Sequence, residues 1–567
     1  MRSRRRHPQA VAALALGMAM YPGVSAAQDD VADDPAAAAE APAAEAADAT
    51  VQVDPRRAKG GDIPTHFVGF SIEWTLIERY MGPNARVGFS NLLDNLGTGI
   101  LRIGGGSQDN VRFDAAAPNS NAVITPEDVA AVRETLNLTN GHAEGGTPAW
   151  GTILGTGLAP QPLRPVATPD NARRFIAQGV DPSFGDEQGS RSLAGIELGN
   201  EPDLNYALNP NAYLTAFVAY SQADVTGTYP VIGPSTSEQI APWQHMKAGN
   251  PLLGIRFFHH WPAILDTIGP IMKERPGGFG ASATDHFYPF ARTCPTDPYR
   301  CPTIERLLSD ERIANFDYQV YTHATEAARR DLGYRVEEIN TAAGRGANGV
   351  SNVAASSVWT LDTLFNAACP QPPDAPGANA DCGVGATGLN LHNAELRAFS
   401  FPAEGNAYYN AVNYDPRADE TQAGSPTPGP SYYALLLFAK LAQGRDGLRP
   451  VEVTPAQAGS SQVKAWQMNG ERSERRVFLI NKGLTETTLD LEAPASEVEV
   501  NRMTPYDPTG AGRTLDAPDV RIDGRGIGAD GSWPGLDPTV VETDGRRVPI
   551  AIGAGEAVVV TLHGHDE

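Results

Sequence analysis

A chain of 567 residues is longer than one ordinary hydrophobic core can organise, so more than one domain is expected. Hydrophobic residues make up 41% of the chain and charged residues 20%, a globular composition that excludes a coiled coil or a collagen. The formal net charge of -23 argues against a surface that binds duplex nucleic acid or anionic lipid, because both need clustered Lys and Arg. A local pocket could still hold an anionic small substrate.

The first 26 residues predict a secretory signal peptide. Four arginines between residues 2 and 6 form a basic head, and an apolar run over residues 10–20 follows it. That run is too short to span a bilayer as a stable helix, and Val24-Ser25-Ala26 offers a small-residue cleavage site. A retained anchor helix is the alternative interpretation. We therefore expect export to the periplasm or the extracellular space, with no stable membrane span after cleavage.

Residues 27–50 consist mostly of Ala, Asp, Glu and Pro, and this composition predicts a disordered linker that cannot form a core.

Residues 51–443 alternate short apolar runs with helical patterns, which predicts an α/β fold, a (β/α)8 barrel. The apolar runs end in polar or charged residues, as buried parallel strands do where they meet at an active-site rim. The eight expected strands lie at residues 67–74, 99–104, 150–158, 193–200, 228–234, 284–288, 334–340 and 386–392. An open doubly wound sheet is the alternative, but polar residues at so many strand ends favour a closed ring.

Residues 444–567 change to short alternating strands that are separated by turn residues. This pattern is typical of an all-β sandwich, which we predict as the C-terminal domain. The segment "ATVQVDP" lies ahead of the barrel strands, and residues 51–62 could add a strand to the sandwich.

The chain contains four cysteines, Cys294, Cys301, Cys369 and Cys382. Export permits disulfides, and joining each cysteine to its neighbour in sequence closes two short loops, the simplest of three possible pairings. A metal site is the alternative, but there is no Cys-x-x-Cys and no His at ligand spacing. We therefore expect disulfides or buried thiols, and no metal.

Two stretches carry the acids that a glycosidase needs. In "IELGNEPD", residues 196–203, Glu201 follows the fourth expected strand, and Pro202 turns the chain out of regular structure at the barrel mouth. In "YRVEEIN", Glu337 and Glu338 occupy adjacent positions of the seventh strand, so alternation lets only one face inward. Glu338 is nearer the strand end and is predicted to face in, with Glu337 toward the helices. A register slip of one residue would exchange them.

Two carboxylates about 5 Å apart across the barrel mouth would suit a retaining glycosidase. One acid attacks the anomeric carbon, while the other protonates the leaving oxygen and later activates water. Asn200 is well placed to hydrogen-bond the sugar 2-hydroxyl, a contact that strengthens in the transition state.

The Asn-Glu-Pro at residues 200–202, together with a glutamate on the seventh strand, is similar to the clan of retaining (β/α)8 glycosidases. More narrowly, the chain resembles glycoside hydrolase family 79, the β-glucuronidase and heparanase group. The matching stretches span roughly residues 67–443 and include "GFSIEW", "LRIGGGSQDN", "GIELGNEPDL", "DHFYPFARTC", "GATGLNLHN" and "PSYYALLLFAKLA". The run "GVSNVAASSVWTLDTLF" after Glu338 is the most specific to the family.

The resemblance implies roles for particular residues. Glu201 would be the acid/base and Glu338 the nucleophile. Glu73 would hold sugar hydroxyls, and Tyr288 would orient the nucleophile. The loop around Gly344 resembles one whose backbone amides receive the uronate carboxylate, as N–H groups of a Gly-rich turn can.

Other positions near this site are less defined by the resemblance. Tyr408 or Tyr409 could add a hydroxyl. Arg345 stands where relatives carry a smaller residue, and it could pair bidentately with the carboxylate or point to solvent. The "GGG" at residues 104–106 replaces a stretch whose third residue is often polar in relatives. It therefore stays open whether the end of the second strand contacts the substrate.

These observations predict an exported, retaining exo-β-glucuronidase that needs no cofactor and acts on a glucuronide or a uronate-containing glycan. An endo-acting, heparanase-like hydrolase of uronate polysaccharides is the alternative within enzymes. A non-catalytic carbohydrate-binding scaffold of the same fold is the alternative outside them, and the presence of both glutamates argues against it.

Overall fold

A computed structural model describes residues 47–563, with gaps at residues 55–59, 121, 141–147, 159–165, 206–208, 238–254, 276, 296–297, 373–380, 395–406, 415–423, 458–461, 472–473, 493–494, 496, 511, 513 and 544. The predicted signal peptide, residues 1–26, and residues 27–46 of the predicted linker lie outside the described residues.

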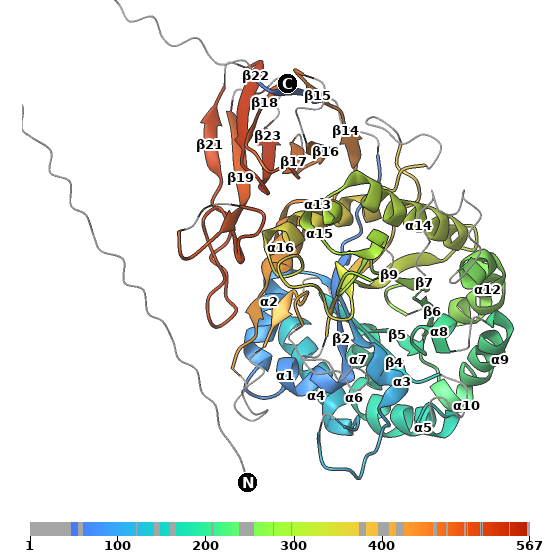
Figure 1. Cartoon of the computed structure of the whole chain (residues 1–567). Helices are drawn as coiled ribbons and strands as arrows, with labels where there is room; N and C mark the ends of the chain where they lie inside the picture. The colour runs from blue at the N-terminus through green and yellow to red at the C-terminus, as the bar shows by residue number, and fades with distance from the viewer. Residues whose placement is uncertain are drawn as a thin grey trace, which may run out of the picture. The chain divides into compact units, whose positions relative to one another are not determined.

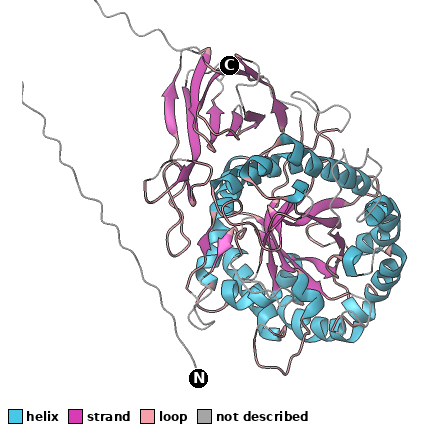
Figure 2. Ribbon diagram, in the orientation of Figure 1, coloured by secondary structure: helices cyan, strands magenta, loops and turns pink. Residues whose placement is uncertain are grey.

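Eight parallel strands close into a barrel in the order β11-β2-β3-β4-β5-β6-β7-β9, with helices around it (Figures 1 and 2). The strands are β2 Val68–Glu73, β3 Gly99–Gly104, β4 Trp150–Thr156, β5 Leu193–Leu198, β6 Val231–Thr236, β7 Ser282–Phe287, β9 Gly333–Ile339 and β11 Gly388–Asn393. Each of the eight segments predicted from sequence overlaps one of them, so the barrel prediction is confirmed.

The helices of the barrel follow its strands. They are α1 Ile77–Met81, α2 Arg86–Leu96, α3 Gly106–Asn110, α4 Pro126–Asn140, α5 Pro169–Phe175, α6 Asp181–Phe184, α7 Glu187–Ser192, α8 Pro202–Asn205, α9 Pro210–Tyr220, α10 Ala223–Thr226, α12 Ile255–Glu274, α13 Ile304–Leu307, α14 Asp310–Ala328, α15 Ala354–Ala368 and α16 Pro430–Leu441. Short elements complete the loops: η1 Trp74–Leu76, η3 Ile176–Val180, η4 Pro298–Arg300, β8 Phe290–Ala291, β10 Ala342–Ala343, β12 Val412–Asn413 and β13 Thr427–Pro428.

The barrel strands form because their residues are apolar on both faces. Every residue of β3, β4, β5, β6 and β11 is buried. One face packs inside the barrel and the other packs under the helices, so the strands read as continuous apolar runs rather than as alternating ones. Charged residues inside such strands are therefore exceptions, and they mark the site described below.

The C-terminal region forms two antiparallel-rich sheets that pack as a sandwich. One sheet has the order β14-β16-β17-β23-β19-β20, with β21 beside β19, and the other has the order β15-β1-β18-β22. Their strands are β1 Ala49–Gln52, β14 Arg449–Val451, β15 Val453–Pro455, β16 Val463–Asn469, β17 Arg475–Asn481, β18 Thr487–Glu492, β19 Glu497–Tyr506, β20 Asp519–Ile522, β21 Thr539–Glu542, β22 Arg547–Ile552 and β23 Ala557–Leu562. Alternating apolar residues of both sheets, Leu489 and Val560 among them, share one core. The segment before the barrel supplies β1, which pairs with β15 and β18.

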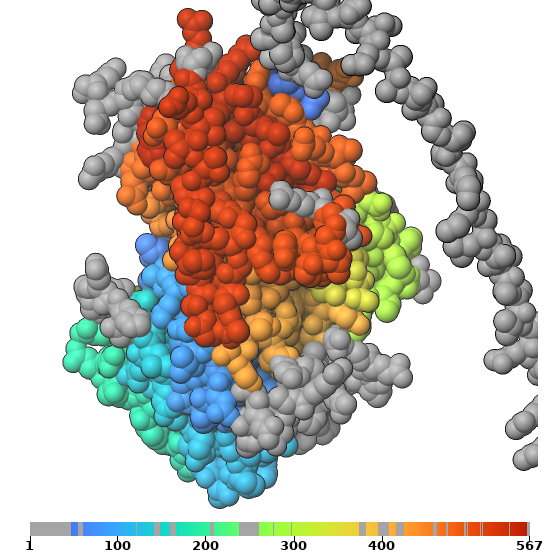
Figure 3. Space-filling model, turned by 90° about the vertical axis from the view of Figure 1, so that its left-hand side faces the viewer, coloured from blue at the N-terminus to red at the C-terminus, as the bar shows by residue number. Residues whose placement is uncertain are grey.

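The sandwich and the barrel share an interface built on α15. All fifteen residues of this helix are buried, because it lies between the barrel and the C-terminal strands. Phe365 packs at ring-centroid distances of 5.5 Å from Trp466 and 4.8 Å from Phe478. A second contact joins the C-terminal region to α2, where Asn91 donates to the carbonyl of Asp530 at 2.8 Å. Figure 3 shows the surface of the C-terminal region in contact with that of the barrel.

Two disulfides close short loops, Cys294–Cys301 and Cys369–Cys382. The second pair flanks the C-terminal end of α15. Among the described residues, no helix combines the length and the apolar character that crossing a membrane requires.

The carboxylate of Asp362 on α15 stabilises the interface between the barrel and the sandwich. It accepts from Lys464 Nζ at 2.8 Å and from Lys482 Nζ at 2.9 Å, and it is almost fully buried. Burial raises the pKa of Asp362, but the two ammonium groups outweigh burial and hold it below its ordinary value. The stabilisation is therefore complete above the unfolded pKa of about 3.9 and is lost only as the pH falls through the lower folded value.

We expect Asp362→Asn to lower the free energy of unfolding by about 3 kcal/mol at pH 7, because it leaves the buried Lys482 without its buried counter-charge. Urea unfolding measures the change. Asp310→Asn is the matched control, since Asp310 also contacts Lys482 but its side chain is 80% exposed, and its loss should stay below about 1 kcal/mol. Equal losses of unfolding free energy in the two variants would contradict the assignment of Asp362 as the buried counter-charge of Lys482.

Candidate active site

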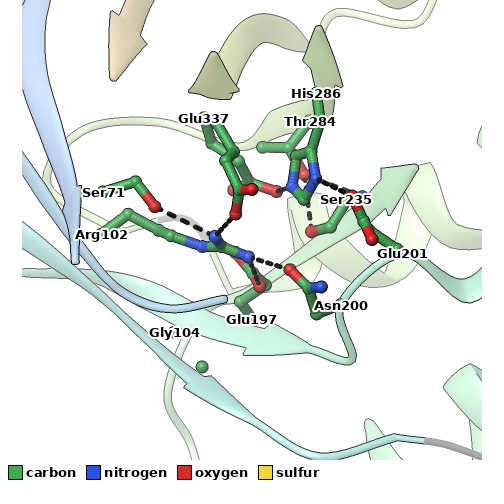
Figure 4. A network of polar contacts seen from close by, with 12 residues as sticks. Ser71, Arg102, Gly104, Glu197, Asn200, Glu201, Ser235, Thr284, His286 and Glu337 are labelled. Carbon is green, nitrogen blue, oxygen red and sulfur yellow. Dashed lines mark hydrogen bonds and ion pairs between the residues drawn. The ribbon is translucent and has the colours of Figure 1, made fainter. Parts of the chain in front are cut away.

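The guanidinium of Arg102, on β3, is the centre of a buried polar network inside the barrel (Figure 4). Two of its N–H groups donate to the carboxylate of Glu197 on β5, at 2.6 and 2.9 Å. The other three donate to Ser71 Oγ at 3.1 Å, Glu338 Oε2 at 2.6 Å and Asn200 Oδ1 at 2.7 Å. All five donors of the side chain are therefore used. The network ties β2, β3, β5 and β9 together at one point.

Glu338 lies on β9 and is held as an ionised carboxylate. Its Oε2 accepts from Arg102, and its Oε1 accepts from the Tyr288 hydroxyl at 2.7 Å. Burial raises the pKa of Glu338, but the charges of His392, His286 and Arg102 and the Tyr288 hydrogen bond outweigh burial and bring it well below its ordinary value. Such a carboxylate has the charge and the fixed orientation that a nucleophile requires.

Glu201 follows β5 in a tightly held turn. Its backbone adopts a left-handed conformation, with φ of 48°, and its N–H donates to the carbonyl of Ser235 at 2.9 Å. Asp203 secures the same turn by accepting from the backbone N–H and the hydroxyl of Ser237, at 2.9 and 2.7 Å. The Glu201 side chain is 26% exposed, and its Oε1 lies 3.2 Å from Nδ1 of His286 on β7.

The two predicted acids meet across the barrel mouth. A carboxylate oxygen of Glu201 and one of Glu338 lie within 4.8 Å of each other. Their environments differ, because Glu338 is buried among donors whereas Glu201 reaches solvent and faces a single imidazole. One acid is therefore fixed in its ionised state, and the other is accessible for proton exchange.

The prediction that Glu337 faces the helices is wrong. The strand pairing jumps from Asp285↔Val336 to His286↔Glu338, so Glu337 is the extra residue of a β-bulge. A bulge breaks the alternation of faces. Arg335, two residues earlier, lies inside the barrel against Asn390, so Glu337 shares its inward face, and the bulge lets the next residue, Glu338, face inward as well. Glu337 is buried there, and its Oε1 lies 3.8 Å from Nε2 of His286 (Figure 4).

Two residues predicted to bind sugar are engaged in the protein. The carboxamide oxygen of Asn200 accepts from Arg102, which turns its amide nitrogen away from the guanidinium. Glu73, at the end of β2, accepts from the backbone N–H groups of Gly106 and Ser107 at 3.1 and 2.7 Å, at the start of α3. The same turn places Gly105 against the Glu73 carboxylate, where a Cβ would lie 2.6 Å from it. The glycines at residues 104–106 therefore allow a carboxylate to approach the backbone.

The loop after β9 contains the other predicted contacts. Gly344 and Arg345 both have positive φ, 74° and 77°, and Arg345 is buried rather than directed to solvent. Arg292 donates to the Gly344 carbonyl at 3.1 Å and lies 5.0 Å above the ring of Tyr408. Tyr409 is buried, with its ring 6.1 Å from that of Tyr288. The structure thus brings two cationic side chains and two tyrosines to the edge of the site.

Sequence analysis missed several residues of this network. Arg102, His286 and His392 are buried and each contacts one of the two acids, and the buried Glu197 pairs with Arg102. The signal for Arg102 was available, because a charged residue inside the apolar run "ILRIG" must find buried partners. The signal for His286 was its place two residues before Tyr288, at the end of the strand β7.

Glu201, His286 and Glu338 could in principle hold a cation, since one ligand atom from each lies within 4.8 Å of the others. Both Glu338 oxygens already accept hydrogen bonds, from Arg102 and Tyr288, and the guanidinium lies 2.6 Å away. A positive charge at that distance opposes a second cation. We therefore assign these side chains to proton and charge chemistry.

Comparisons with solved structures show what fold this is. The chain is similar to a 4-O-α-L-rhamnosyl-β-D-glucuronidase from Fusarium oxysporum 12S, with a TM-score of 0.61 and 18% identity over 91% of this chain and 100% of that one. It is also similar to a GH51 arabinofuranosidase from Xanthomonas axonopodis pv. citri, with a TM-score of 0.54 and 13% identity over 91% and 99% of the two chains. The similarity to a bifunctional glucanase-xylanase from a metagenome library has a TM-score of 0.51 and 11% identity over 91% of this chain and 99% of that one.

No protein-family profile matches the chain, and no curated protein sequence is significantly similar to it. The structural similarities therefore show that the chain has the barrel-plus-β-domain fold seen in these glycoside hydrolases.

We expect Arg102→Leu to lower the free energy of unfolding by about 3 kcal/mol or more at pH 8, because Glu197 and Glu338 then lack their buried cation. The deficit relative to the unmodified protein should shrink toward pH 5, since the orphaned carboxylates can take up protons as the pH falls. Urea unfolding across this pH range measures both effects. A deficit that is independent of pH would indicate lost packing instead.

Proposed function

We propose that the chain is a retaining exo-β-glucuronidase that resembles glycoside hydrolase family 79. The observation that supports this most strongly is the separation of the Glu201 and Glu338 carboxylates, which is at most 4.8 Å between their nearest ligand oxygens. Retaining glycosidases place their two carboxyl groups about 5–5.5 Å apart, whereas inverting enzymes leave room for a water between them. The unequal burial of the two acids supports distinct roles for them.

In the first step, Glu338 attacks the anomeric carbon and forms a glycosyl ester. Arg102 and Tyr288 hold its oxygens in one orientation and keep it ionised before attack. Glu201, at the solvent-accessible side, donates its proton to the leaving oxygen. Burial and the neighbouring Glu338 raise the pKa of Tyr288 well above its ordinary value, so the phenol remains a donor throughout.

In the second step, the Glu201 carboxylate takes a proton from water, and the resulting hydroxide attacks the anomeric carbon. Glu338 leaves as a carboxylate and regains its two hydrogen bonds. The Asn200 amide, whose orientation is set by Arg102, is placed to hydrogen-bond the sugar 2-hydroxyl in both transition states. Glu73 is the further candidate for a contact to sugar hydroxyls.

The charges at the edge of the site favour a uronic acid as the substrate. Arg345 and Arg292 lie on this edge in a chain whose formal net charge is -23, so they create a local cationic region. Gly344, Arg345 and Tyr408 are the proposed contacts of the uronate carboxylate. The similar Fusarium protein is named as a glucuronidase and was solved with Rha-GlcA, which agrees with this proposal for the present chain.

Export is part of the same proposal. The predicted signal peptide would be removed at residue 26, leaving residues 27–50 as a linker, residues 51–443 as the catalytic barrel and residues 444–567 as the sandwich. Two disulfides are consistent with a periplasmic or extracellular protein, because cytosolic thiols are normally kept reduced.

We expect the full chain to hydrolyse an aryl β-glucuronide, with Glu338→Gln losing at least about a thousandfold in kcat because the glycosyl ester can no longer form. Glu201→Ala should lose about 10²–10⁴-fold. Azide should restore turnover to Glu201→Ala only, since this small anion attacks without a general base. An inert full chain that nevertheless binds the glucuronide would favour the non-catalytic scaffold, and internal cleavage of a uronate polysaccharide would favour the endo-acting alternative.

We expect Arg345→Asn to raise KM for the aryl glucuronide about tenfold or more while changing hydrolysis of the matching aryl glucoside little, because only the glucuronide carries a carboxylate. Asn suits this position, since it tolerates the left-handed backbone conformation better than most residues. Steady-state kinetics on both substrates measures the preference. A parallel loss on both would show that Arg345 supports the loop and does not read the carboxylate.

A further inference from the structure

Glu337 and His286 form a buried pair directly behind the proposed acid/base. His286 presents Nδ1 to Glu201 Oε1 at 3.2 Å and Nε2 to Glu337 Oε1 at 3.8 Å, so the imidazole lies between the two carboxylates (Figure 4). Both Glu337 and His286 are 0% exposed. Neither oxygen of Glu337, nor Nε2 of His286, has a hydrogen-bond partner among the described residues.

This arrangement is unfavourable for folding alone. A buried carboxylate without a donor is destabilising. Glu337 faces inward like Arg335 two residues before it, and its carboxylate is directed at the imidazole of His286. A movement of less than about 1 Å would bring Nε2 and the carboxylate within hydrogen-bond distance. The geometry therefore fits an ion pair that acts on His286 better than a purely structural contact.

We propose that Glu337 is a positioning residue that holds His286 as an imidazolium, whose Nδ1–H donates to Glu201 Oε1 and confines the transferable proton of Glu201 to Oε2. This inference rests on the proposed function, because it assigns Glu201 as the acid/base.

The charged and titratable groups around the pair determine its protonation. They come from every strand that faces it and are Arg102 on β3, Glu197 on β5, Glu201 after β5, Tyr288 after β7, Tyr334, Arg335 and Glu338 on β9, and His392 on β11. Burial lowers the pKa of His286, but the charge of Glu338 and the contacts to Glu201 and Glu337 outweigh burial and raise it well above its ordinary value.

The pKa values of the two neighbouring acids, Glu337 and Glu197, shift in opposite directions. Burial raises the pKa of Glu337, but His286 and Arg102 outweigh burial and lower it. Burial raises the pKa of Glu197 to about 8 against the attraction of Arg102, and the charge of Glu337 acts in the same direction as burial. At neutral pH, Glu337 is therefore the ionised partner of His286.

The imidazolium acts at the same atom through both steps of the reaction. In the first step, the proton on Glu201 Oε2 passes to the leaving oxygen, and the carboxylate formed accepts from His286 through Oε1. In the second step, a proton of water passes to Oε2, and the hydroxide attacks the glycosyl ester. His286 keeps both of its protons, so it orients the acid/base and stabilises its ionised state without entering the transfer.

The charge state of His286 can be measured without any substrate. Nitrogen-15 spectra of full-length protein with labelled histidine, assigned with His286→Gln, should show both ring nitrogens of His286 protonated at pH 7.5. In Glu337→Gln, the same ring should be neutral, with one protonated nitrogen. A neutral His286 in the unmodified protein, or an imidazolium that persists in Glu337→Gln, would overturn the proposal.

The pH profile of kcat/KM gives the second test. Loss of the cation 3.2 Å from Glu201 destabilises its carboxylate, so the basic limb should move to higher pH by about one unit in Glu337→Gln. Glu337→Asp keeps the charge and should move the limb less. An unshifted basic limb in Glu337→Gln would refute the positioning role.

Asp285→Asn is the matched control, because Asp285 is also fully buried and adjoins His286 on β7. Its carboxylate faces the helices, where it accepts from Gln319 at 2.7 Å and Tyr334 at 2.6 Å. Asp285→Asn should lower the free energy of unfolding without altering the His286 spectrum or the basic limb of the pH profile. The same shift of the basic limb in this variant would show that a loosened β7, and not the charge of Glu337, causes the effect. If no glycoside is hydrolysed, the proposed function fails, while the spectra still decide the charge of His286.

Discussion

The site depends on one buried guanidinium. Arg102 uses all five donors on Ser71 of β2, Glu338 of β9, Glu197 of β5 and Asn200 directly after β5. A closed barrel brings these residues to one axis, and the single cation compensates carboxylates that could not be buried without it. The same hydrogen bonds fix the orientation of the proposed nucleophile and of the neighbouring amide. Structural and chemical roles therefore coincide at this residue.

Around this cation, two glutamates acquire different properties from their surroundings. Glu338 is enclosed by donors and stays ionised, whereas Glu201 is partly exposed and faces His286. The turn that presents Glu201 is held by a left-handed backbone and by Asp203, so its position does not depend on the flexibility of its own side chain. This asymmetry suits the double-displacement mechanism proposed above, in which one acid bonds to carbon and the other exchanges protons with water.

The sandwich supports the barrel through α15, the helix that follows the loop of Gly344 and Arg345. Its burial on all sides and the pairing of Asp362 with two lysines fix the position of the helix in which that loop ends. Most of the run "GVSNVAASSVWTLDTLF" lies in this helix, so two different surfaces constrain its residues. A helix with one solvent face would tolerate more variation there.

The sequence by itself determined the barrel, the sandwich and the two acids, because buried strands require apolar runs and because Asn-Glu-Pro and "EEIN" follow such runs at the ends where active sites form. It could not show that Glu337 and Glu338 both face inward, since a bulge depends on how β9 pairs with β7 and leaves no periodicity in the chain. Nor could it assemble Arg102 with Glu197 and Glu338, which lie 95 and 236 residues away. Only closure of the barrel decided these contacts, because burial and opposite charges act between atoms that are close in space, whatever their separation along the chain.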